Sequence, residues 1–133
     1  MSVYSKNAVA AEVGRRTVLL VDDEPAVRRV LRRVLERSGY EVLIASDADD
    51  AVAVADRHEG PIDVLVTDVV MPATNGHALA RMLCDRHPGL RVLFVSGYPG
   101  GSLGESIPPS AEFLHKPFSP GALAEKIASV LEK

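Results

Sequence analysis

The sequence contains a single cysteine and no tryptophan, and only 5% of its 133 residues are aromatic. One cysteine cannot form an internal disulfide bond, which excludes a disulfide-stapled secreted domain and predicts a reducing, cytoplasmic compartment. Cys84 falls in an apolar helical pattern with Leu79, Met82 and Leu83. This setting favours a buried structural thiol over a reactive one.

Long apolar runs and a basic excess are also missing. No stretch reaches the roughly 18 apolar residues that a membrane-spanning helix needs, so no membrane segment is predicted. The 15 Lys and Arg against 18 Asp and Glu give a net charge of -3, which argues against a nucleic-acid-binding domain. With 47% hydrophobic and 25% charged residues, the composition and length are those of one globular domain with its own core.

Five short apolar segments alternate with longer segments of helical period. Strands are predicted over residues 17–22, 41–46, 62–68, 90–96 and 112–115, and helices over 26–37, 49–57, 77–86 and 120–131. A loose two-turn helix is predicted at 103–107, inside a stretch rich in Gly and Pro. Residues 1–16 lack a firm period and are predicted to form a disordered tail, so the domain covers 17–133.

The alternation of strands and helices predicts a parallel sheet with helices on both faces. Right-handed crossovers leave few topologies, and they favour a flavodoxin-like, doubly wound five-stranded sheet of order 2-1-3-4-5. The first helix is amphipathic, with arginines on one side and an apolar stripe on the other that comprises Val27, Val30, Leu31, Val34 and Leu35.

Polar residues stand at the carboxyl ends of four of these strands. Asp22 and Asp23 follow the first strand, Asp68 ends the third, Ser96 ends the fourth, and Lys116 follows the fifth. Each alone is a common strand-end or turn residue. Because the carboxyl ends of parallel strands share one edge, and ligands bind there in open α/β sheets, the sequence predicts a single site.

The side chains at this edge fit one kind of chemistry. Clustered carboxylates repel one another and have raised pKa values unless a cation compensates them, and Mg²⁺ prefers such oxygen ligands. Lys116 and Ser96 can bond anionic oxygens. A carboxylate nucleophile with a metal, a lysine and a hydroxyl predicts formation of an acyl phosphate on aspartate.

With these motifs the chain resembles the receiver domain of bacterial response regulators, the phosphorelay proteins of two-component signal transduction. The resemblance spans residues 17–131 and rests on four segments in order: Val-Asp-Asp-Glu-Pro at 21–25, Val-Thr-Asp-Val-Val-Met-Pro at 66–72 with Gly76, Val-Ser-Gly-Tyr at 95–98, and Lys-Pro-Phe at 116–118. The Ser-Gly-Tyr motif makes it most similar to receivers attached to hybrid histidine kinases.

The resemblance implies that Asp68 takes a phosphoryl group from a histidine on a partner protein. It implies that Mg²⁺ is held by Asp22, Asp23, Asp68 and the backbone carbonyl of Val70, with Asp23 the more direct ligand of the acidic pair. Lys116 would then bond the phosphoryl group.

Further residues acquire roles through the same resemblance. Ser96 is implied to move onto the phosphoryl group, and Phe113 is implied to be the aromatic switch residue that follows it. Because Phe113 has no hydroxyl, such a switch must work by packing. The bond before Pro117 is implied to be cis, which would place the Lys116 amine at the edge.

The first helix also carries an arginine-rich face comprising Arg28, Arg29, Arg32, Arg33 and Arg37. The plain interpretation is a solvated face whose aliphatic stems cover apolar surface. The alternative is a docking surface, because this helix in the resembled family packs against a histidine kinase or histidine phosphotransfer protein. Nucleic acid is not expected as a partner.

Other functions are weighed against this one. A haloacid-dehalogenase-type phosphatase would carry an acid two residues beyond its nucleophile, where this chain has Val70, and would need a cap domain for which the length leaves no room. A pseudo-receiver usually lacks one or more of the groups found here. The sequence therefore predicts a signalling domain rather than a turnover enzyme. Whether it is a single-domain regulator or part of a hybrid kinase stays open.

The four histidines show no metal-ligand spacing and are interpreted as exposed or incidental: they are His58, His77, His87 and His115.

Overall fold

The computed structural model describes residues 15–71, 74–96 and 111–132. The predicted helix at 103–107 and most of the predicted tail at 1–16 lie outside these ranges. The elements are β1 (Thr17–Val21), α2 (Pro25–Arg37), β2 (Glu41–Ala45), α3 (Ala48–Arg57), β3 (Val64–Asp68), β4 (Val70–Met71), β5 (Thr74–Asn75), α4 (Gly76–Arg86), β6 (Arg91–Ser96), β7 (Glu112–His115) and α5 (Pro120–Leu131).

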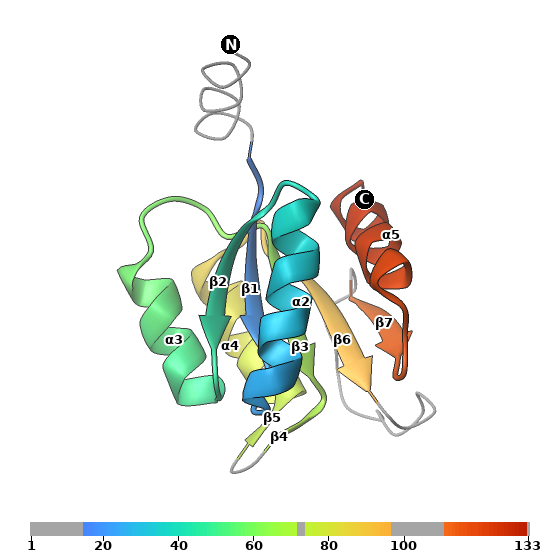
Figure 1. Cartoon of the computed structure of the whole chain (residues 1–133). Coiled ribbons are helices and arrows are strands. Elements are labelled where there is room, and N and C mark those ends of the chain that lie inside the picture. Colours follow the sequence, from blue (N-terminus) through green and yellow to red (C-terminus); the bar gives the residue numbers. More distant parts are fainter. Residues whose placement is uncertain (1–14, 72–73, 97–110, 133) are drawn as a thin grey trace.

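Five of these strands form one parallel sheet in the order β2-β1-β3-β6-β7, seen edge to edge in Figure 1. This is the predicted order 2-1-3-4-5 of the five long strands, so the predicted topology is confirmed. All five strands run downward in Figure 1, and their carboxyl ends therefore meet at the lower edge of the sheet.

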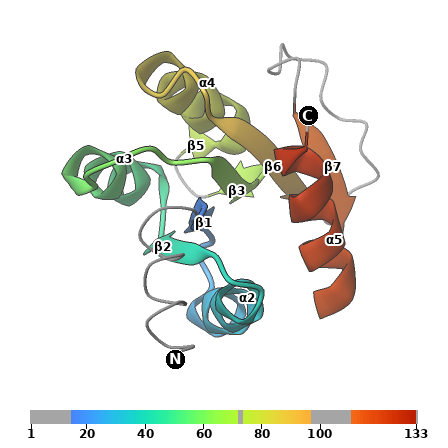
Figure 2. The ribbon, with the colours of Figure 1, turned by 90° about the horizontal axis from the view of Figure 1, so that it is seen from above.

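Helices cover both faces of the sheet, as predicted. Figure 2 shows α3 and α4 on one face and α2 and α5 on the other. The side chains of β1 alternate between the two layers: Val18 and Leu20 pack in the α2–α5 core, whereas Leu19 and Val21 pack in the α3–α4 core. The central strands are buried on both faces, which is the reason for their unbroken apolar sequences.

Local signals set the ends of several helices. Ser119 caps α5 by accepting a hydrogen bond from the backbone N–H of Ala122 at 3.0 Å, and Pro120 occupies its first position. Asp47 caps α3 in the same way, through the backbone N–H of Asp50 at 2.8 Å. Gly39, with φ of 97°, adopts the left-handed conformation just after α2.

The predicted apolar stripe of the first helix is buried only in part. Leu31 and Leu35 are buried, but Val30 is 57% exposed. Val30 lies about 100° around the helix from Leu31, at the margin of the stripe, where neither the sheet nor α5 covers it.

Two further residues, both in α4, differ in burial from what their sequence context suggests. His77, interpreted as exposed or incidental, is only 5% exposed at the start of α4. Met82, placed in the apolar pattern of that helix, is exposed. Cys84 is half-buried, and burial, together with the charge of Asp85, raises the pKa of its thiol, which fits an unreactive cysteine.

The structure also contains a small feature that the sequence did not predict. Val70–Met71 pairs antiparallel with Thr74–Asn75 as a two-residue ladder at the carboxyl edge, directly after β3. Elsewhere the predicted boundaries differ from the observed ones by no more than two residues. Among the helices described, none has the length and apolar character needed to cross a membrane.

Candidate functional site

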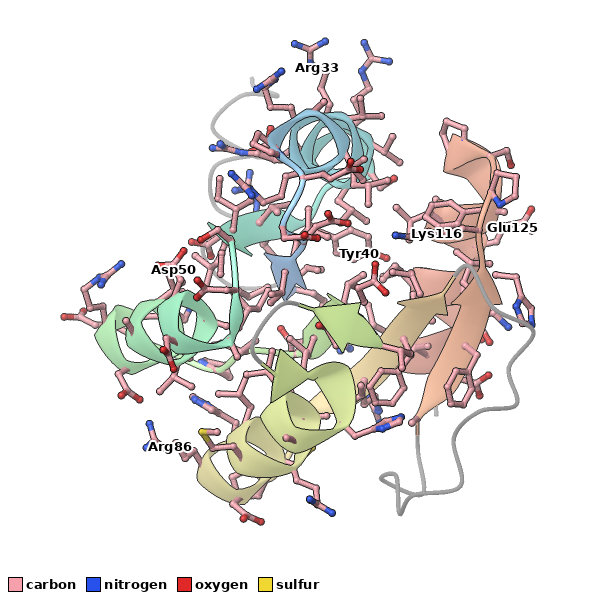
Figure 3. The ribbon with its side chains drawn as sticks, turned by 90° about the horizontal axis from the view of Figure 1, so that it is seen from below. Arg33, Tyr40, Asp50, Arg86, Lys116 and Glu125 are labelled. Atoms are coloured by element: carbon pink, nitrogen blue, oxygen red, sulfur yellow. The ribbon has the colours of Figure 1, made fainter. Side chains whose placement is uncertain are left out.

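Asp68 and Lys116 meet at the carboxyl edge of the sheet. Asp68 ends β3, and Lys116 follows the edge strand β7, with β6 lying between the two strands. The Lys116 Nζ donates a hydrogen bond to Asp68 Oδ2 at 2.7 Å, and the two side chains are 33% and 16% exposed. Figure 3, which views the sheet from this edge, shows the Lys116 amine directed toward the middle of the sheet. The Lys116–Pro117 peptide bond is cis, the isomer that the resemblance implies.

The electrostatic surroundings hold Lys116 in its charged form. Burial acts to lower the pKa of its amine, but the hydrogen bond and charge of Asp68, with the charges of Asp22 and Glu24, act in the opposite direction. The net effect is a pKa above the ordinary lysine value. Lys116 therefore supplies a fixed positive charge beside the carboxylates.

Asp22 is the most deeply buried acid of the site, with 2% of its surface exposed. Its Oδ1 accepts a hydrogen bond from the backbone N–H of Glu24 at 2.9 Å, while its Oδ2 has no hydrogen-bond partner within the part of the chain that the structure describes. Burial is the main cause that raises the pKa of this carboxyl; the Glu24 bond and the Lys116 charge oppose it, and Asp68 and Asp23 reinforce it. Asp22 is thus a buried carboxylate that lacks part of its compensation.

A helix side chain holds the backbone of the acidic turn. Arg28, in the first turn of α2, donates from Nη1 to the backbone carbonyl of Asp22 at 2.7 Å. The sequence pattern groups Arg28 with the other arginines of the helix and does not indicate this contact. Helix geometry could have indicated the contact, because side chains in a helix tilt toward its N-terminus. For α2 that direction leads toward the turn after β1.

Other predicted site residues lie at the same edge, but fewer of their side-chain contacts are described. Asp23 is exposed next to Asp22, and Val70 lies in β4, two residues beyond Asp68. Ser96 ends β6 and is paired in register with His115, although its side chain lies outside what the structure describes. The predicted residues are thereby brought to one edge at the level of the backbone.

Gly76 permits close packing beneath Asp68. Its N–H donates to the carbonyl of Val69 at 2.8 Å, and a Cβ built on it would overlap the carbonyl oxygen of Asp68. A side chain at this position would therefore displace the backbone that carries the central carboxylate.

The predicted switch residue Phe113 belongs to a stack of three rings. Phe113 stacks on the fully buried Phe94, with ring centroids 5.3 Å apart, and Phe94 meets His77 edge-on at 5.1 Å. Sequence reasoning had not assigned a role to Phe94 or His77, because the contact joins β6, β7 and α4 through tertiary packing.

The donor set fits a magnesium ion with several water ligands. Within the described ranges, no three Asp, Glu, His or Cys side chains form a ready-made metal cluster. Mg²⁺, however, usually takes one or two carboxylates and retains water, so such a cluster is not required. The unpartnered, buried Asp22 Oδ2 beside Asp68 is an oxygen that a divalent cation would compensate.

Comparisons with known proteins agree with this fold. The family model described as the response regulator receiver domain matches residues 18–128. The chain is 41% identical over 122 residues to the sensor kinase CckA of Brucella abortus, covering 90% of this chain and 13% of the kinase. It is 33% identical over 119 residues to the response regulator receiver protein CpdR of the same species, covering 87% of this chain and 97% of CpdR.

Solved structures extend the same likeness. The receiver domain of the hybrid histidine kinase CckA has a TM-score of 0.68 at 37% identity, covering 86% of this chain and 98% of that domain. The response regulator TrrA of Thermotoga maritima, crystallised in complex with Mg²⁺ and BeF, has a TM-score of 0.74 at 25% identity, covering 87% of this chain and 99% of TrrA. The predicted likeness to receivers of hybrid kinases is confirmed, and the chain belongs to the response regulator receiver domain family of two-component signalling.

Proposed function

We propose that Asp68 is the phosphoacceptor of a two-component phosphorelay, loaded from a phosphohistidine of a partner protein in the presence of Mg²⁺. The observation that carries this proposal is the 2.7 Å contact between Lys116 Nζ and Asp68 Oδ2, made beside the buried carboxylate of Asp22. A strand-end carboxylate with an adjacent ammonium and an under-compensated acid is suited to receive an anionic phosphoryl group.

In the transfer step, a carboxylate oxygen of Asp68 attacks the phosphorus atom. A P–O bond forms, the P–N bond to the donor imidazole breaks, and its electron pair remains on the imidazole nitrogen, which is protonated by solvent. Lys116 moves from the Asp68 oxygen to an oxygen of the phosphoryl group, so one ammonium serves both states.

Asp22, Asp23, Asp68 and the Val70 carbonyl would hold Mg²⁺, which when bound neutralises charge on the phosphoryl oxygens and the clustered carboxylates. Asp22 contributes a buried negative charge, and Asp23 contributes an exposed one that solvent and metal can reach. Lys116 supplies the remaining positive charge from the β7 side.

The output proposed for phosphorylation is a change in packing at Phe113. Ser96 would move toward the phosphoryl group, and Phe113 would change its position in response. In the present arrangement the half-buried Phe113 rests against Phe94, so its position is supported by a stacked ring rather than by a hydroxyl bond. Such a change alters the surface beside β7, where a partner can respond to it.

The donor is proposed to dock on α2. Arg29, Arg32 and Arg33 are exposed there, Arg33 lies one helical turn from the exposed Val30, and Figure 3 shows Arg33 pointing away from the helix. An exposed aliphatic residue among cations fits a partner surface that is apolar at its centre and acidic at its rim. Arg28 is excluded from this surface, because its guanidinium is engaged with Asp22.

The phosphoacceptor assignment can be tested by intact-mass measurement after incubation with acetyl phosphate, with and without Mg²⁺. One phosphate adduct is expected for the wild type with Mg²⁺, and none for Asp68→Asn. Asp56→Asn is the matched control, because Asp56 lies on the surface of α3 and pairs with Arg86 at 2.8 Å. An adduct of wild-type size in Asp68→Asn would overturn the assignment.

The docking surface can be tested separately by reversing its charge. The double variant Arg29→Glu and Arg33→Glu is expected to accept phosphate from acetyl phosphate at the wild-type rate, but more slowly from an autophosphorylated histidine kinase, and with weaker salt dependence. Equal rates from the kinase for variant and wild type would overturn the docking proposal and leave the phosphoacceptor proposal intact.

A further inference from the structure

The arginines of α2 divide into two groups. Arg29 and Arg33 are exposed, and Arg32 forms an exposed ion pair with Glu36 at 3.0 Å. Arg28 is half-buried, and its Nη1 lies 2.7 Å from the carbonyl oxygen of Asp22. A short bond between a guanidinium and a buried carbonyl differs in kind from a solvated surface charge.

The carbonyl that Arg28 holds lies within the acidic turn. This carbonyl belongs to the planar peptide unit that joins Asp22 to Asp23. Its direction therefore sets the orientation of the peptide plane that leads into Asp23. The backbone N–H of Asp22 donates to the carbonyl of Ala45 at 3.2 Å, and Asp22 Oδ1 accepts from the N–H of Glu24 at 2.9 Å. Arg28 completes this set from α2, whose first turn is tied back by the bond from Arg28 N–H to the Glu24 carbonyl at 2.9 Å.

We infer that Arg28 is a positioning residue for the metal-binding acidic pair: its bond to the Asp22 carbonyl fixes the Asp22–Asp23 turn in the geometry that receives the cation. The inference rests on the proposed function, because it gives Arg28 a role toward the same Mg²⁺ site. It assigns Arg28 to the site rather than to the docking surface of α2.

Two effects of Arg28 on metal binding have opposite signs. As a nearby cation it repels Mg²⁺, an effect worth about twofold in affinity for a solvent-screened charge. As a hydrogen-bond donor it preorders the turn, and loss of a bond to a charged donor is worth about tenfold. The positioning effect is therefore expected to dominate, and removal of Arg28 is expected to weaken Mg²⁺ binding despite the removal of a positive charge.

Three variants separate these effects. Arg28→Met removes the donor and keeps an unbranched side chain, Arg28→Lys keeps a charged donor of different reach, and Arg29→Met removes an exposed charge from the adjacent position. Titration calorimetry of the unphosphorylated proteins with MgCl₂ is expected to give about tenfold weaker binding for Arg28→Met, with partial rescue in Arg28→Lys. Arg29→Met is expected to stay within about twofold of wild type.

A second measurement needs no metal. Amide hydrogen exchange at Asp23 and Glu24 in the metal-free protein is expected to be faster in Arg28→Met than in wild type, and unchanged in Arg29→Met, because the turn loses its tether. Thermal unfolding of each variant shows whether it is folded, and Arg28→Lys serves if Arg28→Met is not.

Mg²⁺ affinity equal to or tighter than wild type in a folded Arg28 variant, with unchanged exchange at Asp23 and Glu24, would overturn the inference. The proposed function fails in a different way, through a wild-type protein that neither binds Mg²⁺ nor accepts phosphate at Asp68. In that event the exchange measurement still decides whether Arg28 holds the turn.

Discussion

Asp63 and Asp22 lie at opposite ends of the sheet and are treated in opposite ways. Asp63, just before β3, accepts a hydrogen bond on Oδ2 from the backbone N–H of Thr17 at 2.8 Å, and its Oδ1 lies 4.0 Å from Arg16 Nη1. Asp22, just after β1, is more deeply buried and leaves Oδ2 without a partner among the described residues. The amino end of the sheet therefore uses an aspartate to stabilise the fold, whereas the carboxyl end holds an aspartate whose charge is only partly compensated by the described residues.

The largest expected difference between the two ends concerns glycine. Gly76→Ala is expected to lower the free energy of unfolding by about 2–4 kcal/mol, because its Cβ would overlap the Asp68 carbonyl oxygen and the backbone must move. Gly89→Ala, before β6 at the amino end, is the matched control: nothing lies within 4 Å of its Cβ, so a change under about 0.5 kcal/mol is expected. Urea denaturation measures both, and equal losses would show that the carboxyl edge is not tightly packed.

Removal of the hydrogen-bonded Asp63 carboxylate should destabilise the protein clearly, but less than Gly76→Ala. Asp63→Ala leaves the Thr17 N–H without its acceptor, and a loss of about 1–3 kcal/mol is expected. Asp56→Ala breaks an exposed ion pair with Arg86 and is expected to cost at most about 0.5 kcal/mol. Chemical denaturation at pH 7 provides both values; a neutral Asp63→Ala would contradict the structural role assigned to this carboxylate.

Substitution of Asp22 is expected to change the free energy of unfolding in the opposite direction. Asp22→Asn should stabilise the metal-free protein at pH 7 by about 1 kcal/mol, because it removes a buried charge with incomplete compensation and keeps an oxygen for the Glu24 N–H. The native state raises the pKa of Asp22, so the contribution of this carboxyl to wild-type stability falls as pH rises from the ordinary aspartate value through the raised one. The advantage of Asp22→Asn should therefore be present at pH 7 and vanish below the ordinary pKa. Thermal melts across this pH range measure it.

Magnesium should reverse the stability order of the wild type and Asp22→Asn. A ligand that binds only the native state stabilises it by about 1.4 kcal/mol at tenfold excess over its dissociation constant, so MgCl₂ should raise the melting temperature of the wild type. Asp22→Asn should gain less, because it lacks the buried charge that a cation at the proposed site would compensate. Asp63→Asn, altered at the opposite end, should gain as much as wild type. An equal gain for Asp22→Asn would argue against a metal role for Asp22.

Much of the fold could be read from local patterns. The short apolar runs predicted the five long strands, and the segments of helical period predicted α2, α3, α4 and α5. The backbone location of the site followed from parallel topology alone, because Asp68 and Lys116 end up at one edge whenever their strands run in the same direction. Such features depend on neighbours in sequence or on strand direction, both of which a sequence pattern expresses.

The features missed depend on contacts between distant elements. The stack of Phe113, Phe94 and His77 joins two strands and a helix, and the Val70–Met71 ladder closes back on the loop after β3. The exposure of Val30 depends on how much of α2 its neighbours cover. None of these has a periodic signature, because each is set by the relative placement of elements already formed.

By itself the sequence determined the parallel sheet, its strand order and the identity of the groups gathered at its carboxyl edge, because hydrophobic period and strand direction are local or topological properties. The tertiary structure decided how those groups are compensated: Lys116 is paired with Asp68, Asp22 keeps an unpartnered oxygen, and Arg28 turns from the surface of α2 to the Asp22 carbonyl. Burial and hydrogen-bond geometry depend on what packs around each atom, and that is settled only when the helices lie on the sheet.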